Sequence, residues 1–145
     1  MKILLDTNVA LDLLLDRKPF SDDAAILFSM VERGLVNGYL CATTITTISY
    51  LMSKVVGWER AKESIRGLLT IFDIAPVNRD VLDAALKGDF EDFEDAVLYE
   101  AAQQTGADLI ITRNERDFKG SVISVHSPLE AVKIIPQFLE DNDRQ

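Results

Sequence analysis

Five carboxylates stand within eight residues of this chain, directly before an apolar helical run. Residues 89–96 read DFEDFEDA. On a helical wheel Asp95 projects from the apolar side of the helix that follows, which is the side expected to face a sheet. Asp92 lies three residues earlier, and side chains at this helical spacing are neighbours. A buried carboxylate without a partner is costly, so Asp95 predicts a nearby counter-charge or metal ion.

Two further groups of oxygen-bearing side chains follow predicted strands. Asp6 ends the apolar run KILLD and opens the segment DTNVALDLL, which also contains Asn8 and Asp12. The other group follows the apolar run DLIIT, and its members are Thr112, Asn114 and Asp117. Helix capping accounts for each group taken singly, because Asp, Asn and Thr favour helix N-termini. Capping does not account for an acid among core residues or for three groups at matching positions.

The rest of the sequence predicts strands alternating with helices. Short apolar runs predict strands at 2–6, 38–42, 72–77, 108–112 and 121–125. Helical periodicity predicts helices at 7–16, 22–34, 44–55, 58–70, 79–87, 93–105 and 128–139, with Gly34, Gly57 and Gly106 as C-terminal caps. Strands that are apolar almost throughout belong to a sheet covered on both faces. We therefore expect a three-layer α/β/α sandwich with a mostly parallel sheet of about five strands, formed by residues 1–140 as a single domain, and a polar tail at 141–145.

The ends of the predicted strands are the expected place for chemistry. In open parallel sheets, ligands bind beyond the carboxyl ends of the strands. Two carboxylates ~4 Å apart repel by about 4 kcal/mol at an effective dielectric near 20, so Asp6, Asp95 and Asp117 need a counter-charge if they meet there. Hard oxygen ligands of this type suit Mg²⁺ or Mn²⁺. The acids predict a site for a divalent cation, with Asp92 as a further ligand.

Composition limits the classes of protein to which this chain can belong. The net charge of −9 is unlike that of proteins that grip nucleic acid through many phosphate contacts, and it suits a basic partner protein. Nucleic-acid chemistry would rest on metal ions and on local basic residues such as Arg113 and Arg116, which otherwise pair with acids of their own loop. The single cysteine, Cys41, and the single histidine, His126, exclude zinc sites built from those ligands, and we interpret His126 as structural. One cysteine and no apolar run long enough to span a bilayer predict a cytoplasmic protein with no membrane segment.

Three motifs resemble the PIN domain family. They are ILLDTNV at the N-terminus, DFEDA before a helix and ADLIITRNERDF after it, and the similarity spans nearly the whole chain in order. The resemblance implies an α/β/α sandwich and metal-dependent cleavage of RNA by clustered acids, as in the VapC-like toxin ribonucleases. It also implies a homodimer and, for a toxin, a cognate antitoxin protein. By resemblance, Asp6, Asp95 and Asp117 match the family's acids, and Asn114 matches a neighbouring polar position.

If the chain is such a nuclease, we expect a role for each residue of the site. A water activated by Mg²⁺ or Mn²⁺ would hydrolyse a phosphodiester of single-stranded RNA. Asp6, Asp95 and Asp117 would be the ligands, and Asp92 a ligand or an acid just behind them. Asn8, Thr112 and Asn114 would orient ligands or waters, and Arg113 and Arg116 would hold substrate phosphate.

The chain departs from the family at one place. The family usually has a Glu in the helix after the second strand, and our alignment puts Ser49 there, in a helix without any acid. A hydroxyl can join a hydration shell but brings no negative charge. Either Asp92 or Asp12 replaces the missing acid, or the site binds one ion weakly, or catalysis is impaired. The alternative function is therefore a catalytically weakened PIN-fold module for binding or regulation.

Overall fold

Five parallel strands form the centre of the molecule. The computed structural model describes residues 1–144 and orders the strands β3-β2-β1-β4-β5 in one sheet. Leu5, at the end of β1, pairs in register with Leu40 of β2 and Ile111 of β4. The strands are β1 (Lys2–Leu5), β2 (Asn37–Cys41), β3 (Asp73–Ala75), β4 (Leu109–Ile111) and β5 (Ser124–His126).

Each predicted helix is present. The helices are α1 (Thr7–Leu14), α2 (Phe20–Glu32), α3 (Ala42–Val56), α4 (Trp58–Ile71), α5 (Arg79–Lys87), α6 (Phe93–Thr105) and α7 (Pro128–Asp143), and a 3₁₀ turn, η1 (Glu115–Phe118), follows β4. Gly34, Gly57 and Gly106 all have positive φ where helices end, as the capping pattern predicts. No helix within the described residues is long and apolar enough to cross a bilayer.

Two boundaries differ from the sequence prediction by three residues or more. Strand β5 begins at Ser124 rather than at 121, because the Ser121 hydroxyl bonds locally to both the N–H and the carbonyl of Ile123. Helix α7 continues to Asp143, so part of the expected polar tail is helical. Gln145 lies outside the described residues.

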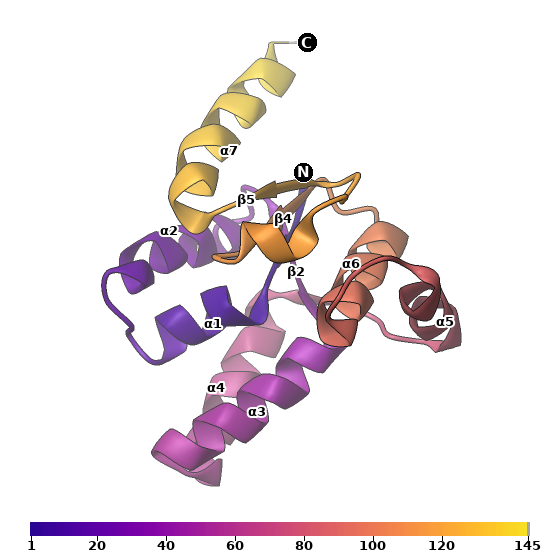
Figure 1. Cartoon of the computed structure of the whole chain (residues 1–145). Coiled ribbons are helices and arrows are strands. Elements are labelled where there is room, and N and C mark those ends of the chain that lie inside the picture. The colour runs from indigo at the N-terminus through magenta and orange to yellow at the C-terminus, as the bar shows by residue number, and fades with distance from the viewer. Residues whose placement is uncertain (145) are drawn as a thin grey trace.

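The helices form two outer layers around the sheet. Ile3 and Leu5 of β1 pack into a core with α1, α2, α3, α4 and α7. Leu4, which points the opposite way, packs into a second core with α5, α6 and Phe118 of η1. Figure 1 shows α5 and α6 on one side of the sheet and the other helices opposite. The expected three-layer α/β/α sandwich is confirmed.

The strand order reverses direction between β1 and β4, and this position defines where a site can form. Chain connections leave β1 toward one edge of the sheet and β4 toward the other, which opens a crevice beyond their carboxyl ends. Asp6 and Thr112 are the first residues after these two strands. The Asp6 N–H donates to the Ile111 carbonyl at 2.9 Å, so the two strand ends are joined directly.

A buried carboxylate fastens the segment after β4 to helix α1. Asp12 is fully buried, and its two oxygens accept from Nε and Nη2 of Arg113 at 2.6 and 3.1 Å. Arg17 Nε lies 2.8 Å from the same carboxylate, and Arg17 Nη2 donates to the Asn8 carbonyl. The Arg113 guanidinium also stacks on the ring of Phe20 at 4.0 Å. We call Asp12, Arg17 and Arg113 the arginine clamp.

The arginine clamp predicts a large loss of stability on removal of its shared acid. Asp12→Asn leaves two guanidinium groups facing each other without compensating charge. We expect the free energy of unfolding to fall by about 3 kcal/mol, at the low end for a broken buried pair because both arginines reach solvent. Urea unfolding followed by circular dichroism measures the loss.

Asp22→Asn is the matched control for this substitution. It removes an exposed carboxylate that pairs with Lys18 at 2.8 Å. We expect it to change the free energy of unfolding by no more than about 0.5 kcal/mol. Equal losses in the two variants would show that the arginine clamp does not hold the fold.

Candidate active site

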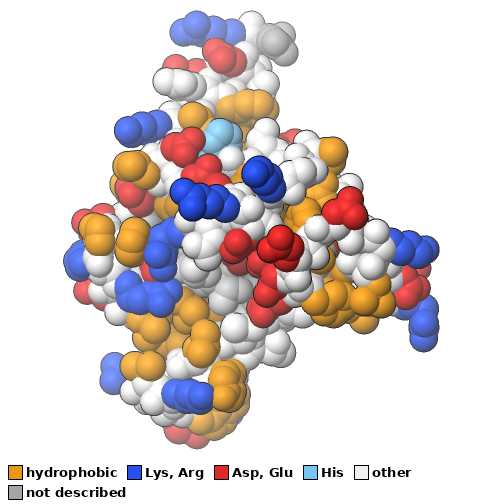
Figure 2. Space-filling model, in the orientation of Figure 1, with side chains coloured by type: hydrophobic (Ala, Val, Ile, Leu, Met, Phe, Trp, Pro, Cys, Tyr) orange, Lys and Arg blue, Asp and Glu red, His pale blue; other side chains and the backbone are white. Residues whose placement is uncertain are grey.

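Acids from three separate segments line one pocket at the carboxyl ends of β1 and β4. Asp6 follows β1, three acids come from the start of α6, and Asp117 lies in η1. Figure 2 shows acidic side chains gathered in the middle of this face, with basic side chains beside them. We call this the acidic pocket, and its charged lining residues are Asp6, Arg17, Asp92, Glu94, Asp95, Arg113 and Asp117.

Asp6 is buried and held in a fixed orientation. One carboxylate oxygen accepts from the Thr7 N–H at 2.7 Å, and the other accepts from the Thr112 hydroxyl at 2.8 Å. Burial raises the pKa of Asp6, while the hydrogen bonds from Thr112 and Thr7 act to lower it. The charges of Glu94 and Asp117 raise this pKa further. Asp6 therefore caps α1 and also belongs to the acidic pocket.

Asp95 has the most perturbed carboxyl group of the site. It is half-buried in the first turn of α6, and its N–H donates to Asp92, the residue that caps the helix, at 2.9 Å. Burial is the largest cause that raises the pKa of Asp95 to about 7. The charges of Asp92, Asp6, Asp117 and Glu94 add to it, in that order. The start of α6 therefore provides both the helix cap and carboxylates of the acidic pocket.

The negative charge of the acidic pocket has no basic partner. Within residues 1–144, no Lys or Arg forms an ion pair with Asp6, Glu94, Asp95 or Asp117. The two arginines of the pocket wall pair with Asp12 instead. Oxygen donors with uncompensated charge fit a hard divalent cation such as Mg²⁺ or Mn²⁺.

The acids are not drawn together around a single point. No group of three or more His, Cys, Asp or Glu side chains in the described part of the chain is arranged as a ready-made metal site. Carboxylates 4 Å apart repel by about 4 kcal/mol at an effective dielectric near 20, which favours open spacing. In addition, both oxygens of Asp6 are engaged by Thr7 and Thr112.

The predicted supporting residues form one hydrogen-bond network. The Thr112 hydroxyl donates to Asp6 and accepts from the Asn114 N–H at 3.0 Å. The Asn8 side chain lies 3.4 Å from both Asp6 and Thr112, and its oxygen accepts from the Arg113 N–H at 3.3 Å. This network joins the start of α1 to the segment after β4, and Asn8 and Asn114 line the acidic pocket.

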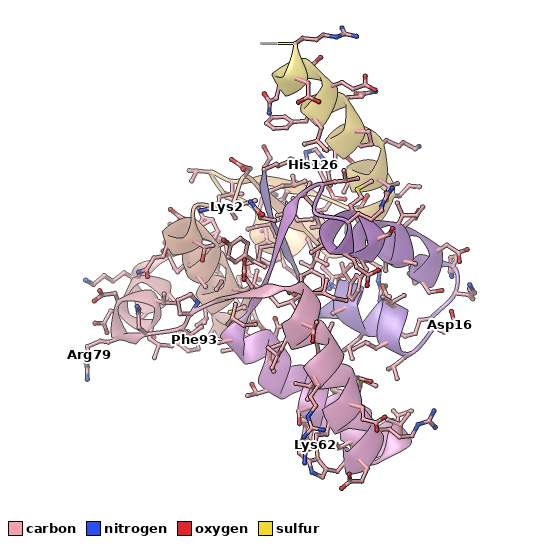
Figure 3. All side chains as sticks on the ribbon, turned by 180° about the vertical axis from the view of Figure 1, so that it is seen from behind. Lys2, Asp16, Lys62, Arg79, Phe93 and His126 are labelled. Carbon is pink, nitrogen blue, oxygen red and sulfur yellow. The ribbon has the colours of Figure 1, made fainter. Side chains whose placement is uncertain are left out.

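Three residues considered from sequence lie outside the acidic pocket. Ser49 is half-buried on α3 and is not among the residues that line it. Asp12 does not replace the missing acid, because it is fully buried and its oxygens serve the arginine clamp. His126 lies 3.1 Å from Glu130, and Figure 3 shows it beside α7, away from Phe93 at the start of α6.

The basic residues divide between two adjoining pockets. Arg113 lines the acidic pocket, with one edge of its guanidinium bonded to Asp12. Arg116 and Lys119 line a second pocket, which shares Asp92, Asp95 and Asp117 with the first. A surface with positive charge therefore adjoins the acids.

Sequence reasoning missed Glu94 and Arg17. On a helical wheel Glu94 points away from the sheet, but the first turn of α6 also faces α3, and Glu94 accepts from the Thr47 hydroxyl at 3.2 Å. Arg17 reaches the pocket through the turn after α1, where Asp16 has a φ of 48°. The extra Glu within the acidic run was the available signal for Glu94, and no sequence signal marked Arg17.

This chain is similar in sequence to one curated protein and in fold to several solved structures. Ribonuclease VapC1 of Aquifex aeolicus (strain VF5) is 26% identical over 129 residues, which cover 86% of this chain and 88% of that protein. A toxin–antitoxin complex from Klebsiella pneumoniae contains a chain that is 23% identical, with a TM-score of 0.66 over 87% of this chain and 97% of that one. VapC20 of Mycobacterium tuberculosis, described as a sarcin-ricin loop cleaving toxin, is 15% identical, with a TM-score of 0.65 over 83% of this chain and 96% of that one.

A model of the PIN domain matches residues 2–116. That range contains four of the five acids of the acidic pocket and ends one residue before Asp117. It also contains all strands except β5. The chain belongs to the PIN domain family.

Proposed function

We propose that this chain is a divalent-metal-dependent endoribonuclease that cleaves single-stranded RNA as the toxin of a toxin–antitoxin pair. The observation that carries the proposal is the uncompensated acidic pocket at the β1–β4 crevice. The name of the Aquifex relative supports RNA as the substrate, and the name of the Klebsiella complex supports the toxin role. The weakened-module alternative has less support, because five acids line the pocket even though α3 has none.

Asp6, Asp95 and Asp117 are the proposed ligands of Mg²⁺ or Mn²⁺, with Asp92 as a further ligand or an acid just behind them. When bound, the cation lowers the pKa of a coordinated water and stabilises charge on phosphate oxygens. Thr112 holds the Asp6 carboxylate in one orientation through its 2.8 Å hydrogen bond. Asp95 must give up its proton to act as a ligand, which its pKa of about 7 makes dependent on pH.

Basic residues beside the acids are the proposed contacts for substrate phosphate. Arg116 and Lys119 line the adjoining pocket and lie in exposed positions. Arg113 keeps Nε and Nη2 on Asp12, so its proposed contact uses the remaining nitrogen. Unpaired RNA fits this arrangement best, because the backbone must bend to bring one phosphate into an acid-lined pocket.

A basic antitoxin, a second copy of the chain and a cytoplasmic location complete the proposal. Exposed apolar side chains on α3 and α4 support a surface that another protein covers, and the net charge of −9 favours a basic partner. Figure 2 shows hydrophobic side chains gathered over this end of the molecule. They include Tyr50, Val55, Trp58 and Leu69.

The partner proposal predicts a defined assembly in solution. We expect size-exclusion chromatography with light scattering to give a dimer of the isolated chain. If a small protein is encoded beside its gene, co-expression with that protein should give a larger complex that no longer cleaves RNA. A chain that stays monomeric and does not bind the neighbouring protein would contradict the toxin role.

The enzyme proposal predicts that Asp95→Asn abolishes cleavage while the fold stays intact. We expect Mg²⁺-dependent cleavage of an unstructured RNA of mixed sequence to fall by at least about 100-fold, because even changes behind the ligands cost 10- to 100-fold. Asp83→Asn is the control, since it removes an exposed acid on α5, away from the pocket. Cleavage by Asp95→Asn at the level of the unmodified chain would refute the assigned role.

The raised pKa of Asp95 predicts that metal binding and stability are linked through pH. Its pKa is about 7 in the folded chain against an ordinary value of 3.8, so between these values the folded chain holds a proton that the unfolded chain has released. The free energy of unfolding therefore falls as pH rises from about 4 to about 7, and this loss is complete above pH 7.

Thermal unfolding in EDTA checks this linkage. We expect Asp95→Asn to be more stable than the unmodified chain at pH 8 and to lose this advantage near pH 4. Millimolar Mg²⁺ should raise the Tm of the unmodified chain at pH 8 more than that of the variant. A difference between the two proteins that does not change with pH would contradict the account.

A further inference from the structure

Helix α3 contacts the acid-rich start of α6 but contributes no acidic side chain to the acidic pocket. Its sequence, ATTITTISYLMSKVV, contains no acid. Ser49, the residue aligned with the usual Glu, does not line the pocket. Thr47 does face this region, and its hydroxyl donates to Glu94 Oε1 at 3.2 Å. A carboxylate from α6 thus lies where α3 would otherwise present one.

Glu94 belongs to the acidic pocket. It lines the pocket together with Asp6, Asp95 and Asp117. Among the described residues no Lys or Arg pairs with Glu94, so no salt bridge neutralises its charge.

The position of Glu94 in the helix explains how it reaches the pocket. Asp92 caps α6, so Glu94 and Asp95 are the second and third helical residues. Consecutive helical side chains diverge by about 100°. Asp95 therefore approaches from the sheet side and Glu94 from the α3 side, and the longer Glu side chain can reach back toward Asp6.

We infer that Glu94 supplies from α6 the acidic ligand that α3 lacks, and that Thr47 positions it. This inference rests on the proposed metal-dependent function and adds Glu94 to the ligand set. Asp92 then serves mainly as the helix cap, since its carboxylate accepts from the Asp95 N–H. The acidic ligand expected on the helix after β2 would thus come from α6 instead.

Calorimetric titration of the full chain with Mn²⁺ tests the inference without reference to cleavage. We expect Glu94→Gln, which keeps an oxygen for Thr47, to weaken Mn²⁺ binding by at least about 10-fold. Thr47→Val removes only the positioning hydrogen bond and should weaken binding by about 2- to 5-fold. Asp89→Asn removes one charge from the same acidic run, at a residue that lines the adjoining pocket but not the acidic pocket, and should stay within about 2-fold.

A compensating variant tests whether the position of the charge is what counts. Thr47→Glu combined with Glu94→Gln returns the carboxylate to α3 across the same contact. We expect it to recover most of the Mn²⁺ affinity lost in Glu94→Gln. Circular dichroism and unfolding in EDTA verify that each variant is folded.

The outcomes separate this inference from the proposed function. Mn²⁺ binding that survives Glu94→Gln but is lost in Asp95→Asn would overturn the role of Glu94 and leave the metal-dependent function in place. Equal weakening by Glu94→Gln and Asp89→Asn would also overturn it, because general charge would then be the cause. Failure of the unmodified chain to bind Mn²⁺ would overturn both.

Discussion

Repulsion among carboxylates at one edge of a parallel sheet is the constraint on which the rest of this structure depends. Asp6, Asp95 and Asp117 come from segments far apart in the chain and line the same acidic pocket, where the charge of Asp117 raises the pKa of both Asp6 and Asp95. Folding places them there although no basic side chain of the described residues neutralises them. Such an arrangement works against stability at neutral pH, and the proposed divalent cation would relieve it.

The sheet topology, a backbone hydrogen bond and the ion pairs of the arginine clamp hold these acids near one another. The reversal of strand order between β1 and β4 creates the crevice, and the Asp6 N–H ties the two strand ends together. The arginine clamp then fastens the segment after β4 to α1. Because Asp12 occupies both arginines, positive charge stands beside the pocket without neutralising it. The clamp and the pocket are thus two parts of one electrostatic arrangement.

The elements and part of the site could be predicted from sequence, because they depend on local patterns. Apolar runs located the strands, and Asp6 and Thr112 had to meet since both follow neighbouring parallel strands. Glu94 was missed because a helical wheel considers the sheet as the helix's only neighbour, whereas Thr47 of α3 also reaches the first turn and bonds to Glu94. The pairing of Asp12 with Arg113 joins residues 101 positions apart, and no local pattern specifies it. Our alignment proposed Ser49 of α3 for the site, whereas the α3 residue that bonds to an acid of the pocket is Thr47, through Glu94.

Carbon NMR of the aspartate carboxyl groups, titrated with pH in EDTA and again in Mg²⁺, tests the central claim most directly. Asp95, assigned by comparison with Asp95→Asn, should titrate near pH 7 without divalent ions and at distinctly lower pH when Mg²⁺ is present. An Asp95 signal that titrates near pH 3.8, and that Mg²⁺ leaves unchanged, would contradict this account. It would show that neither burial nor the neighbouring acids raise the pKa of Asp95 and that the acids do not bind a common ion.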